Sequence, residues 1–276
     1  MKLQLAISPC PNDTYIFEAL IHKRIDCGNL DFELQMADVE ELNKRAGQGL
    51  PDVTKLSFFA YVFVSDRYRI LNAGAALGKN NGPLLISRYK IYPDEVDDLK
   101  IAIPGFRTTA NLLMSMAYPK AINKKEYLFS DIEEVVLDKE ADAGLIIHES
   151  RFTFEKKGLR KIRDMGEYWE QEMKMPLPLG CIAVRRTISD DLAGNIDGMV
   201  RNSILYAKKN PSVVADFIRK NAQELDDEVI EKHIGLYVNE YSENLGETGK
   251  KAIQTLFEKA YQHKLTDHIP EDVFVK

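Results

Sequence analysis

One short stretch, Ala143 to Ile147, is apolar throughout and ends abruptly at His148, which Glu149 and Ser150 follow. A short apolar run between polar, turn-forming residues is typical of a strand that is buried on both faces. In open α/β sheets, ligands bind just beyond the carboxyl ends of such strands. The pattern therefore makes His148 a candidate site residue. A histidine that ends a strand and bonds a neighbouring carbonyl explains this segment equally well, so other stretches have to decide.

The first 50 residues alternate strand and helix patterns, which predicts a βαβ unit. Apolar and polar residues alternate over 2–7 and again over 30–36. A loop with two prolines, residues 8–14, separates the first strand from a helix that we expect over 15–20. After the second strand, Asp38 and Glu41 form a capping-box-like start to a further helix.

Three predicted helix starts carry small polar residues that suit an anion. They are Asn12 with Asp13, either of which can cap the first helix, Ser57 before the apolar run 58–64, and Thr108 with Thr109. Free N–H groups at a helix start bind carboxylates or phosphates, and hydroxyl groups add donors. A simple amino cap is the alternative role, above all for Ser57. The chain has neither a Walker pattern nor G-x-G-x-x-G, so no nucleotide is implied.

The second half of the chain repeats the alternation of strand and helix patterns, which predicts a second α/β lobe. A strand over 100–104 leads through the loop 105–111 into a helix, and the residues from 189 to 262 are helical in pattern. We expect a large lobe from residues 1–92 and 186–276, and a smaller lobe, 93–185, inserted by two chain crossings. Helix starts from both lobes and His148 would then face one ligand cleft, which is the plan of the type 2 periplasmic-binding-protein fold.

Composition limits the kinds of binding partner that we expect for this chain. The net charge of -6 argues against a broad nucleic-acid or anionic-membrane surface, so a small anionic ligand needs a locally positive pocket. Neither an export signal nor a membrane span is evident, and we expect a cytoplasmic protein. The three cysteines, Cys10, Cys27 and Cys181, are widely spaced without a metal-ligand pattern, so neither disulfides nor a metal site are predicted. We expect Cys10 to act as small packing. Sequence predicts no oligomeric state.

Five stretches together resemble the 1,4-dihydroxy-6-naphthoate synthases, enzymes of the futalosine route to menaquinone. The resemblance covers nearly the whole chain, and the motifs are specific jointly although each is weak alone. They are Ser8-Pro9-Cys10-Pro11-Asn12-Asp13-Thr14, Asp52-Val53-Thr54-Lys55-Leu56-Ser57-Phe58-Phe59-Ala60-Tyr61, Arg107-Thr108-Thr109-Ala110, Ala143-Gly144-Leu145-Ile146-Ile147-His148-Glu149 and Pro176-Leu177-Pro178-Leu179-Gly180.

The resemblance implies a substrate, a base and a set of contact residues. The substrate implied is cyclic dehypoxanthinyl futalosine, cleaved to the dihydroxynaphthoate without a metal or an organic cofactor. His148 is implied as the catalytic proton acceptor, and a base with a pKa near neutral suits such proton removal. The resemblance also implies substrate contacts from both lobes, by Lys55, Leu56, Ser57, Thr108 and Thr109.

Several alternatives stay open at this point. Either Lys55 or Arg107 could supply positive charge to the substrate carboxylate. Glu149 would point away from His148 on an extended strand, and we expect no partnership between them. The other histidines, His22, His233, His263 and His268, are interpreted as surface or structural residues. A chorismate dehydratase of the same pathway shares the fold, and a solute-binding protein would need no base at all.

Overall fold

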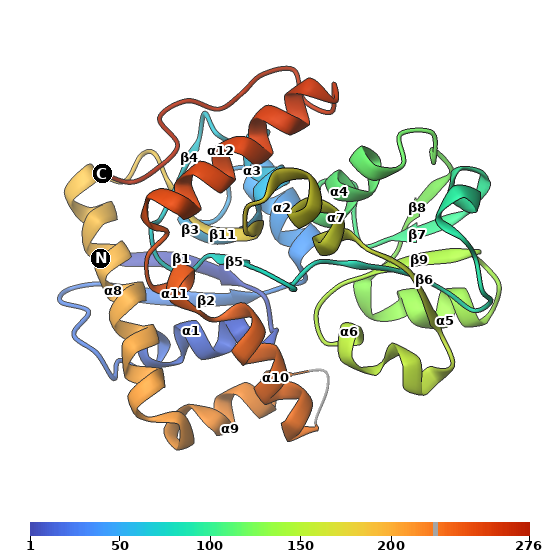
Figure 1. Ribbon diagram of the computed structural model, residues 1–276. Helices are drawn as coiled ribbons and strands as arrows, with labels where there is room; N and C mark the ends of the chain where they lie inside the picture. The colour runs from blue at the N-terminus through green and yellow to red at the C-terminus, as the bar shows by residue number, and fades with distance from the viewer. Residues whose placement is uncertain (223–225) are drawn as a thin grey trace.

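The computed structural model describes residues 1–222 and 226–276, and it has two mixed β-sheets with helices around each (Figure 1). Six strands form the first sheet, in the order β2-β1-β3-β11-β4 with β5 paired to β11. Their bounds are β1 (Lys2–Ile7), β2 (Asp31–Met36), β3 (Val53–Ser57), β4 (Tyr68–Ile70), β5 (Ala76–Gly78) and β11 (Leu177–Arg185). β1 is parallel to both β2 and β3, as a βαβ unit requires, and β11 runs antiparallel to β3.

Five strands form the second sheet, in the order β10-β6-β9-β7-β8. Their bounds are β6 (Leu84–Ser87), β7 (Ile101–Ile103), β8 (Lys124–Glu126), β9 (Ala143–Ile146) and β10 (Arg160–Asp164). β9 is parallel to β7 and antiparallel to β6. It is buried along its whole length, so the apolar run before His148 is a buried central strand, as the sequence predicted.

Helices cover both faces of the first sheet and surround the second. Around the first sheet lie α1 (Pro11–Ile21), α2 (Val39–Gly47), α3 (Phe58–Val62), α8 (Asp190–Lys209), α9 (Pro211–Asn221), α10 (Asp227–Tyr237), α11 (Glu240–Glu243) and α12 (Gly246–Gln262). Around the second lie α4 (Thr109–Ala117), α5 (Ile132–Leu137), α6 (Ser150–Thr153), α7 (Met165–Met173) and the 3-10 turns η1 (Pro93–Asp98), η2 (Phe129–Asp131) and η3 (Phe154–Lys157).

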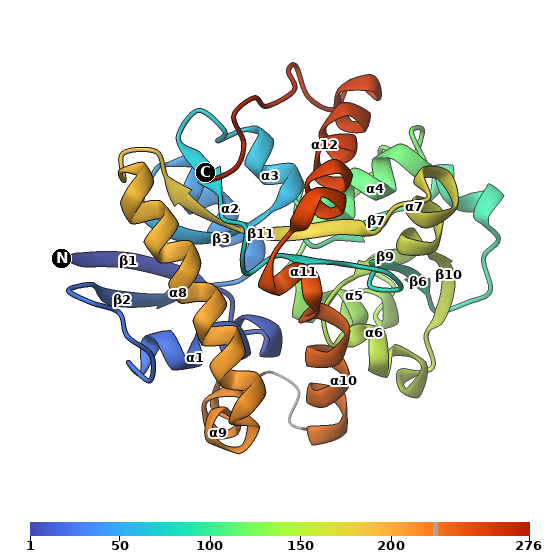
Figure 2. The ribbon, with the colours of Figure 1, turned by 60° about the vertical axis from the view of Figure 1, so that its left-hand side comes forward.

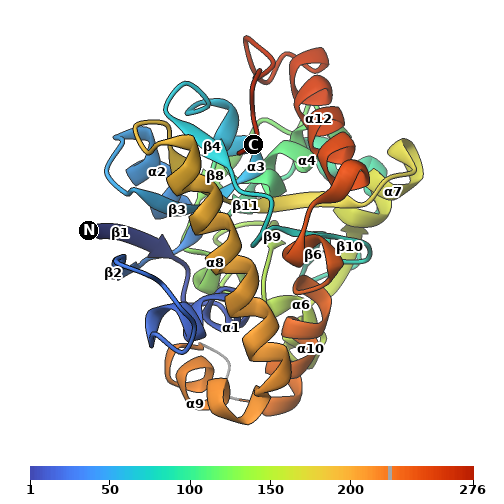
Figure 3. The same cartoon turned by 90° about the vertical axis from the view of Figure 1, so that its left-hand side faces the viewer.

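Apolar side chains explain why α8 lies across the first sheet (Figures 2 and 3). Its Ile196, Val200 and Ile204 are buried in one cluster with Leu5 of β1 and Ile182 of β11. These three α8 positions are spaced four residues apart, which places them on one face of the helix. Asp38 begins α2 as predicted, because its carboxylate accepts hydrogen bonds from the N–H groups of Glu40 and Glu41.

The chain passes twice between the two sheets, at places where consecutive strands belong to different sheets. The first crossing lies between β5 and β6, and the second lies between β10 and β11 and contains α7. The boundaries predicted from sequence differ from this, because β6 belongs to the second sheet and β11 to the first. The charged stretch 94–98 lies in the turn η1, between β6 and β7 of the second sheet, and is part of neither crossing. We therefore propose lobe boundaries within residues 79–83 and 165–176.

The second crossing carries the one tryptophan of the chain, Trp169. Its side chain is fully buried, and its indole Nε1 donates a hydrogen bond to the carbonyl of Pro176, 3.1 Å away. Trp169 shares a core cluster with Leu145 of β9 and Leu177 of β11, so apolar packing continues from one sheet to the other. Among the helices of the two described ranges, none combines the length and apolar character that a membrane span requires.

Candidate functional site

A cavity of about 630 Å³, open to solvent, has walls from both lobes. Side chains from β3, from the start of α4 and from the end of β9 line it, together with residues of the first crossing and of α10. Six of the residues singled out in the sequence are among them: Asn12, Lys55, Ser57, Thr108, Thr109 and His148.

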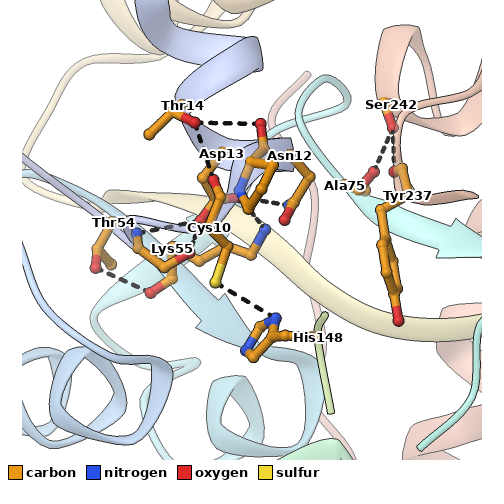
Figure 4. A network of polar contacts seen from close by, with 12 residues as sticks. Cys10, Asn12, Asp13, Thr14, Thr54, Lys55, Ala75, His148, Tyr237 and Ser242 are labelled. Atoms are coloured by element: carbon orange, nitrogen blue, oxygen red, sulfur yellow. Dashed lines mark hydrogen bonds and ion pairs between the residues drawn. The ribbon is translucent and has the colours of Figure 1, made fainter. Parts of the chain in front are cut away.

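Two further predicted residues do not line this cavity. Leu56 is fully buried in the apolar core, because side chains alternate along β3 and those of Lys55 and Ser57 take the cavity side. Its contact with substrate stays a prediction that its side chain does not support. Asp13 is also fully buried, beneath Lys55 and Asn12 (Figure 4).

The start of α1 differs from the expected cap. The helix begins at Pro11, with Cys10 at the N-cap position, so Asn12 and Asp13 already lie in its first turn. A proline is well suited to the first helical position because its missing N–H would have no partner there. The prediction that Asn12 or Asp13 caps this helix is therefore wrong. The Asp13 carboxylate instead accepts hydrogen bonds from the N–H and the hydroxyl of Ser8, at 3.1 and 2.7 Å.

Lys55 and Asp13 form a buried ion pair at the floor of the cavity. The Lys55 Nζ lies 2.6 Å from Asp13 Oδ1, and the two residues are 6% and 0% exposed. Burial strengthens such a pair but desolvates both charges, so each partner depends on the other. Arg107, the other candidate cation, is exposed and lies over the ring of Phe63. Lys55 is thus the one of these two cations that lines the cavity.

Asn12 links this ion pair to His233, which sequence reasoning had not placed in the site. The Asn12 Nδ2 donates to Asp13 Oδ1, so its Oδ1 is the acceptor that faces His233 Nε2 at 2.9 Å. His233 therefore carries its proton on Nε2. It is fully buried, and its ring stacks 6.3 Å from that of His148, so of the two roles expected for His233, surface or structural, the structural one applies. No local signal marks it, because it lies 221 residues from Asn12 in sequence.

His148 lies immediately beyond β9, where the chain turns. Its φ of 60° is in the left-handed region, which residues with a β-carbon seldom adopt outside turns and functional sites. The imidazole Nδ1 lies 3.4 Å from Cys10 Sγ (Figure 4). The ring also meets that of Phe129 edge-on. Within the described residues, its buried Nε2 has no hydrogen-bond partner. The contact of Nδ1 is thus with a thiol, which does not match the strand-capping alternative.

The same turn brings Glu149 close to His148, contrary to the expectation from an extended strand. One ligand atom each from Cys10, His148 and Glu149 lies within 4.8 Å of the others. These atom types are ones that zinc binds, but zinc requires the thiolate form of cysteine. Burial raises the pKa of Cys10 well above its usual value, and the charge of Glu149 raises it further. Without a cation beside it, the Cys10 thiol therefore stays protonated at neutral pH.

Burial also keeps His148 neutral. Desolvation lowers the pKa of His148 to about 4, and Lys55 adds to this effect while Asp13 opposes it. At neutral pH the imidazole is therefore a proton acceptor beside an uncharged thiol. The neutral imidazole is free to accept a proton, but a pKa of about 4 makes it a weaker base than the near-neutral one that the sequence predicted. The raised pKa of Cys10 does not suit a cysteine nucleophile, which needs a lowered pKa.

The three hydroxyl residues differ in how far the fold already uses them. Thr108 caps α4, because its Oγ1 accepts from the N–H of Asn111, which confirms its capping alternative. Thr109 Oγ1 donates to the carbonyl of Leu179 at 2.8 Å and so joins α4 to β11. Ser57 is at the N-cap position of α3 without a side-chain bond to it, and its Oγ accepts from Asn43. Its own proton remains to be donated to a ligand.

The buried His233 predicts a specific dependence of stability on pH. Desolvation lowers the pKa of His233 well below its usual value, whereas the unfolded residue takes up a proton near pH 6.5. The free energy of unfolding should therefore fall as the pH is lowered through 6.5. Replacing His233 with glutamine should make this fall shallower by up to about 1.4 kcal/mol per pH unit. Urea unfolding at several values between pH 7 and 5 measures it. The exposed His263, replaced in the same way, is the control; an unchanged slope in His233→Gln would contradict the prediction.

The chain is similar to a known family and to known proteins over nearly its whole length. A family described as menaquinone biosynthesis matches residues 3–262. A protein of Thermus thermophilus named 1,4-dihydroxy-6-naphthoate synthase is 42% identical over 273 residues, which cover 99% of each chain. A Streptomyces coelicolor protein of the same name is 38% identical over 279 residues, covering 98% of this chain and 96% of the relative.

Solved structures show the same fold. A crystal structure of a protein from Archaeoglobus fulgidus is 35% identical and has a TM-score of 0.91, with 96% of this chain and 98% of the other covered. A Candida albicans protein described as having the generic periplasmic-binding-protein fold has a TM-score of 0.70 at 14% identity, with 99% and 93% covered. The fold is therefore periplasmic-binding-protein-like, as the sequence predicted. From the family match over most of its length and the two full-length relatives, the chain belongs to the menaquinone biosynthesis family.

Proposed function

We propose that this protein is a 1,4-dihydroxy-6-naphthoate synthase that converts cyclic dehypoxanthinyl futalosine to 1,4-dihydroxy-6-naphthoate. The names of the Thermus and Streptomyces relatives support the product. The observation that carries the proposal is His148 itself, a neutral imidazole in the cavity whose buried Nε2 has no partner within the described residues. The reaction is a carbon–carbon lyase step that needs a base and, in this proposal, no cofactor.

His148 Nε2 is the atom that we propose removes the proton. Its other nitrogen, Nδ1, faces Cys10 Sγ, and an Nδ1–H donated to this sulfur leaves the lone pair on Nε2. Removing a proton next to an activating group lets the sugar-derived fragment depart and the ring become aromatic. The left-handed backbone at residue 148 aims the ring away from the strand direction and back toward Cys10.

The opposite part of the cavity suits the carboxylate of the substrate. Lys55 supplies positive charge there, and Ser57 supplies a hydroxyl proton. The first N–H groups of α4 add to these donors, and the positive end of the helix dipole favours an anion. Thr108 and Thr109 shape this wall while their hydroxyls hold α4 in place. Asp13 already balances the charge of Lys55, so in this proposal the start of α4 and the Ser57 hydroxyl account for the preference for a small anionic substrate.

The activity should have an unusually low acid limit. Because the pKa of His148 is lowered to about 4, the base stays unprotonated at all pH values well above 4. We expect kcat/KM to be flat between pH 8 and 5 and to fall only as the pH approaches 4. Measuring initial rates across this range, with circular dichroism to confirm that the protein stays folded, tests it. A fall centred near pH 6.5 would show that the imidazole is solvated in the free enzyme.

A turnover assay separates the proposed function from its alternatives. Purified protein is incubated with cyclic dehypoxanthinyl futalosine, and the naphthoate product is identified by chromatography. Turnover of chorismate instead would identify the dehydratase alternative. Tight binding of the futalosine derivative without product would identify a binding protein that retains the fold. The cytoplasmic location, and the absence of nucleic-acid and membrane partners, stay predictions from sequence.

A further inference from the structure

Asn81 is a buried residue of the cavity wall whose side-chain amide has no partner at either end. It is 1% exposed and lines the cavity beside His148 and Tyr237. Within residues 1–222 and 226–276, neither its Oδ1 nor its Nδ2 makes a hydrogen bond. Buried polar side chains nearly always have partners, so an amide with both ends free requires an explanation. Since it faces a ligand cavity, a ligand group is the explanation to test.

Strand pairing places Asn81 next to the proposed base. β6 and β9 are antiparallel, with Leu84 opposite Ile146. The residues just before Leu84 therefore lie beside those just after Ile146, and Asn81 and His148 end up at the same edge of the second sheet. Asn81 thus faces the part of the cavity where the reaction would occur.

The backbone around Asn81 is held firmly, which leaves the amide as the free group. Glu170 Oε1 accepts from the N–H of Asn80 at 2.7 Å, and Arg151 donates to the carbonyl of Gly82. The hydroxyl of Tyr237 donates to the carbonyl of Asn81 at 3.4 Å. Tyr237 is itself fixed, because its carbonyl accepts from the Ser242 hydroxyl (Figure 4). A residue positioned in this way loses little further entropy when it binds a ligand.

The neighbouring Gly78 makes room for this amide. A β-carbon at residue 78 would lie 3.3 Å from Asn81 Nδ2, closer than such contacts normally are. The absence of a side chain at Gly78 therefore lets the Asn81 amide pack over the end of β5. The amide position is determined by contacts on its backbone side, whereas its polar atoms are not used by the fold.

We propose that Asn81 binds hydroxyl groups of the sugar-derived part of the substrate and so distinguishes the substrate from its aromatic product. An amide offers a donor and an acceptor side by side, and a hydroxyl group is the complement of both. A carboxylate has no proton for Oδ1, and the product, which keeps its two ring hydroxyls, has lost the hydroxyls of the sugar-derived fragment. The inference rests on the proposed function, because it is that reaction which has a sugar-derived fragment at the reacting end.

The test compares Asn81→Leu with wild type in turnover and in product binding. We expect kcat/KM for cyclic dehypoxanthinyl futalosine to fall roughly 10- to 100-fold, the loss expected when hydrogen bonds to hydroxyls are removed. The Kd for 1,4-dihydroxy-6-naphthoate, by isothermal titration calorimetry, should change less than about 3-fold, because the product lacks the sugar-derived hydroxyls. Asn81→Ala, which adds no branched side chain, should lose turnover in the same direction.

The Tm measured without ligand distinguishes a ligand-binding role of Asn81 from a structural role, because only a structural role predicts a lower Tm for the variant. Asn81→Leu should leave Tm unchanged or raise it, since no hydrogen bond of the fold is lost. The matched control is Asn43→Leu. Asn43 is also buried, but its Oδ1 accepts from the N–H of Ser57 and its Nδ2 donates to Glu40 Oε2, both at 3.0 Å. Its replacement should lower Tm.

Three results would overturn the assignment of Asn81. They are unchanged kcat/KM in both Asn81 variants, an equal loss of affinity for substrate and product, and a fall in Tm as large as that of Asn43→Leu. If wild type shows no turnover of the futalosine derivative, the proposed function fails and the sugar-binding role of Asn81 fails with it. Wild-type turnover with unaffected Asn81 variants removes this inference alone.

Discussion

His148→Ala is expected to lower kcat for naphthoate formation by about 100- to 10,000-fold, the usual contribution of a general base. The physical reason is that the structure holds an uncharged imidazole in the cavity, with a pKa lowered to about 4 by burial. Alanine removes the proton acceptor without placing another group near Cys10. Single-turnover rates, with the product separated by chromatography, measure the chemical step directly.

The matched control for this variant is His263→Ala, because His263 is exposed beyond the end of α12. It should keep the wild-type rate. Equal rates for His148→Ala and wild type would return His148 to a structural role and leave the product assignment to the other assays. A lower Tm without loss of rate per folded molecule would lead to the same conclusion.

Lys55→Met is expected to lower the free energy of unfolding by about 3–5 kcal/mol, because it leaves a buried carboxylate without its counter-ion. Asp13 is fully buried, and its remaining contacts are with Asn12 and Ser8. Hydrogen bonds from neutral groups do not replace the charge of an ammonium 2.6 Å away. Urea unfolding monitored by circular dichroism gives the change.

Two comparisons separate this effect from a general loss of packing. Neutralising both partners, in Lys55→Met with Asp13→Asn, should recover most of the stability, because no unpaired charge remains buried. In contrast, Lys2→Met breaks the exposed pair of Lys2 with Glu33 and should cost at most about 1 kcal/mol. A Lys55→Met cost as small as that of Lys2→Met would mean that Asp13 is solvated or protonated in the fold.

Local patterns in the sequence predicted the fold class and most of the cavity wall. Short buried strands and capped helices have periodicities that a sequence displays, as the run before His148 and the Asp38 cap illustrate. The family motifs pointed to Lys55, Ser57 and Thr108, which line the cavity. They also pointed to Leu56, whose side chain lies in the apolar core instead. Strand alternation, applied to the motif, would have separated Leu56 from its neighbours.

Other errors had causes that lie in the backbone. Asn12 and Asp13 were expected to cap α1, whereas the preference of proline for the first helical turn places the start at Pro11. Glu149 was expected to face away from His148, which holds only while the strand stays extended. The sequence does not indicate a left-handed backbone at His148, because glycine or asparagine usually occupies such positions.

Residues from distant segments were missed for a different reason. His233 and Asn81 enter the site through contacts with Asn12 and with the β6–β9 pair, and those contacts depend on the whole fold. A histidine in a helical pattern and an asparagine in an Asn-Gly-Pro turn have many ordinary interpretations in a sequence. Only their burial and their unpaired atoms distinguish them.

Trp169 gives this protein an intrinsic fluorescent reporter in the second crossing between its two sheets. It is the sole indole in the sequence, and it is buried in α7, on the segment that leads the chain from the second sheet back to the first. With excitation at wavelengths that tyrosine does not absorb, the emission therefore comes from one position. Changes in wavelength or quenching during titration with a ligand would report rearrangement of the lobes in real time, with no label and no engineered residue.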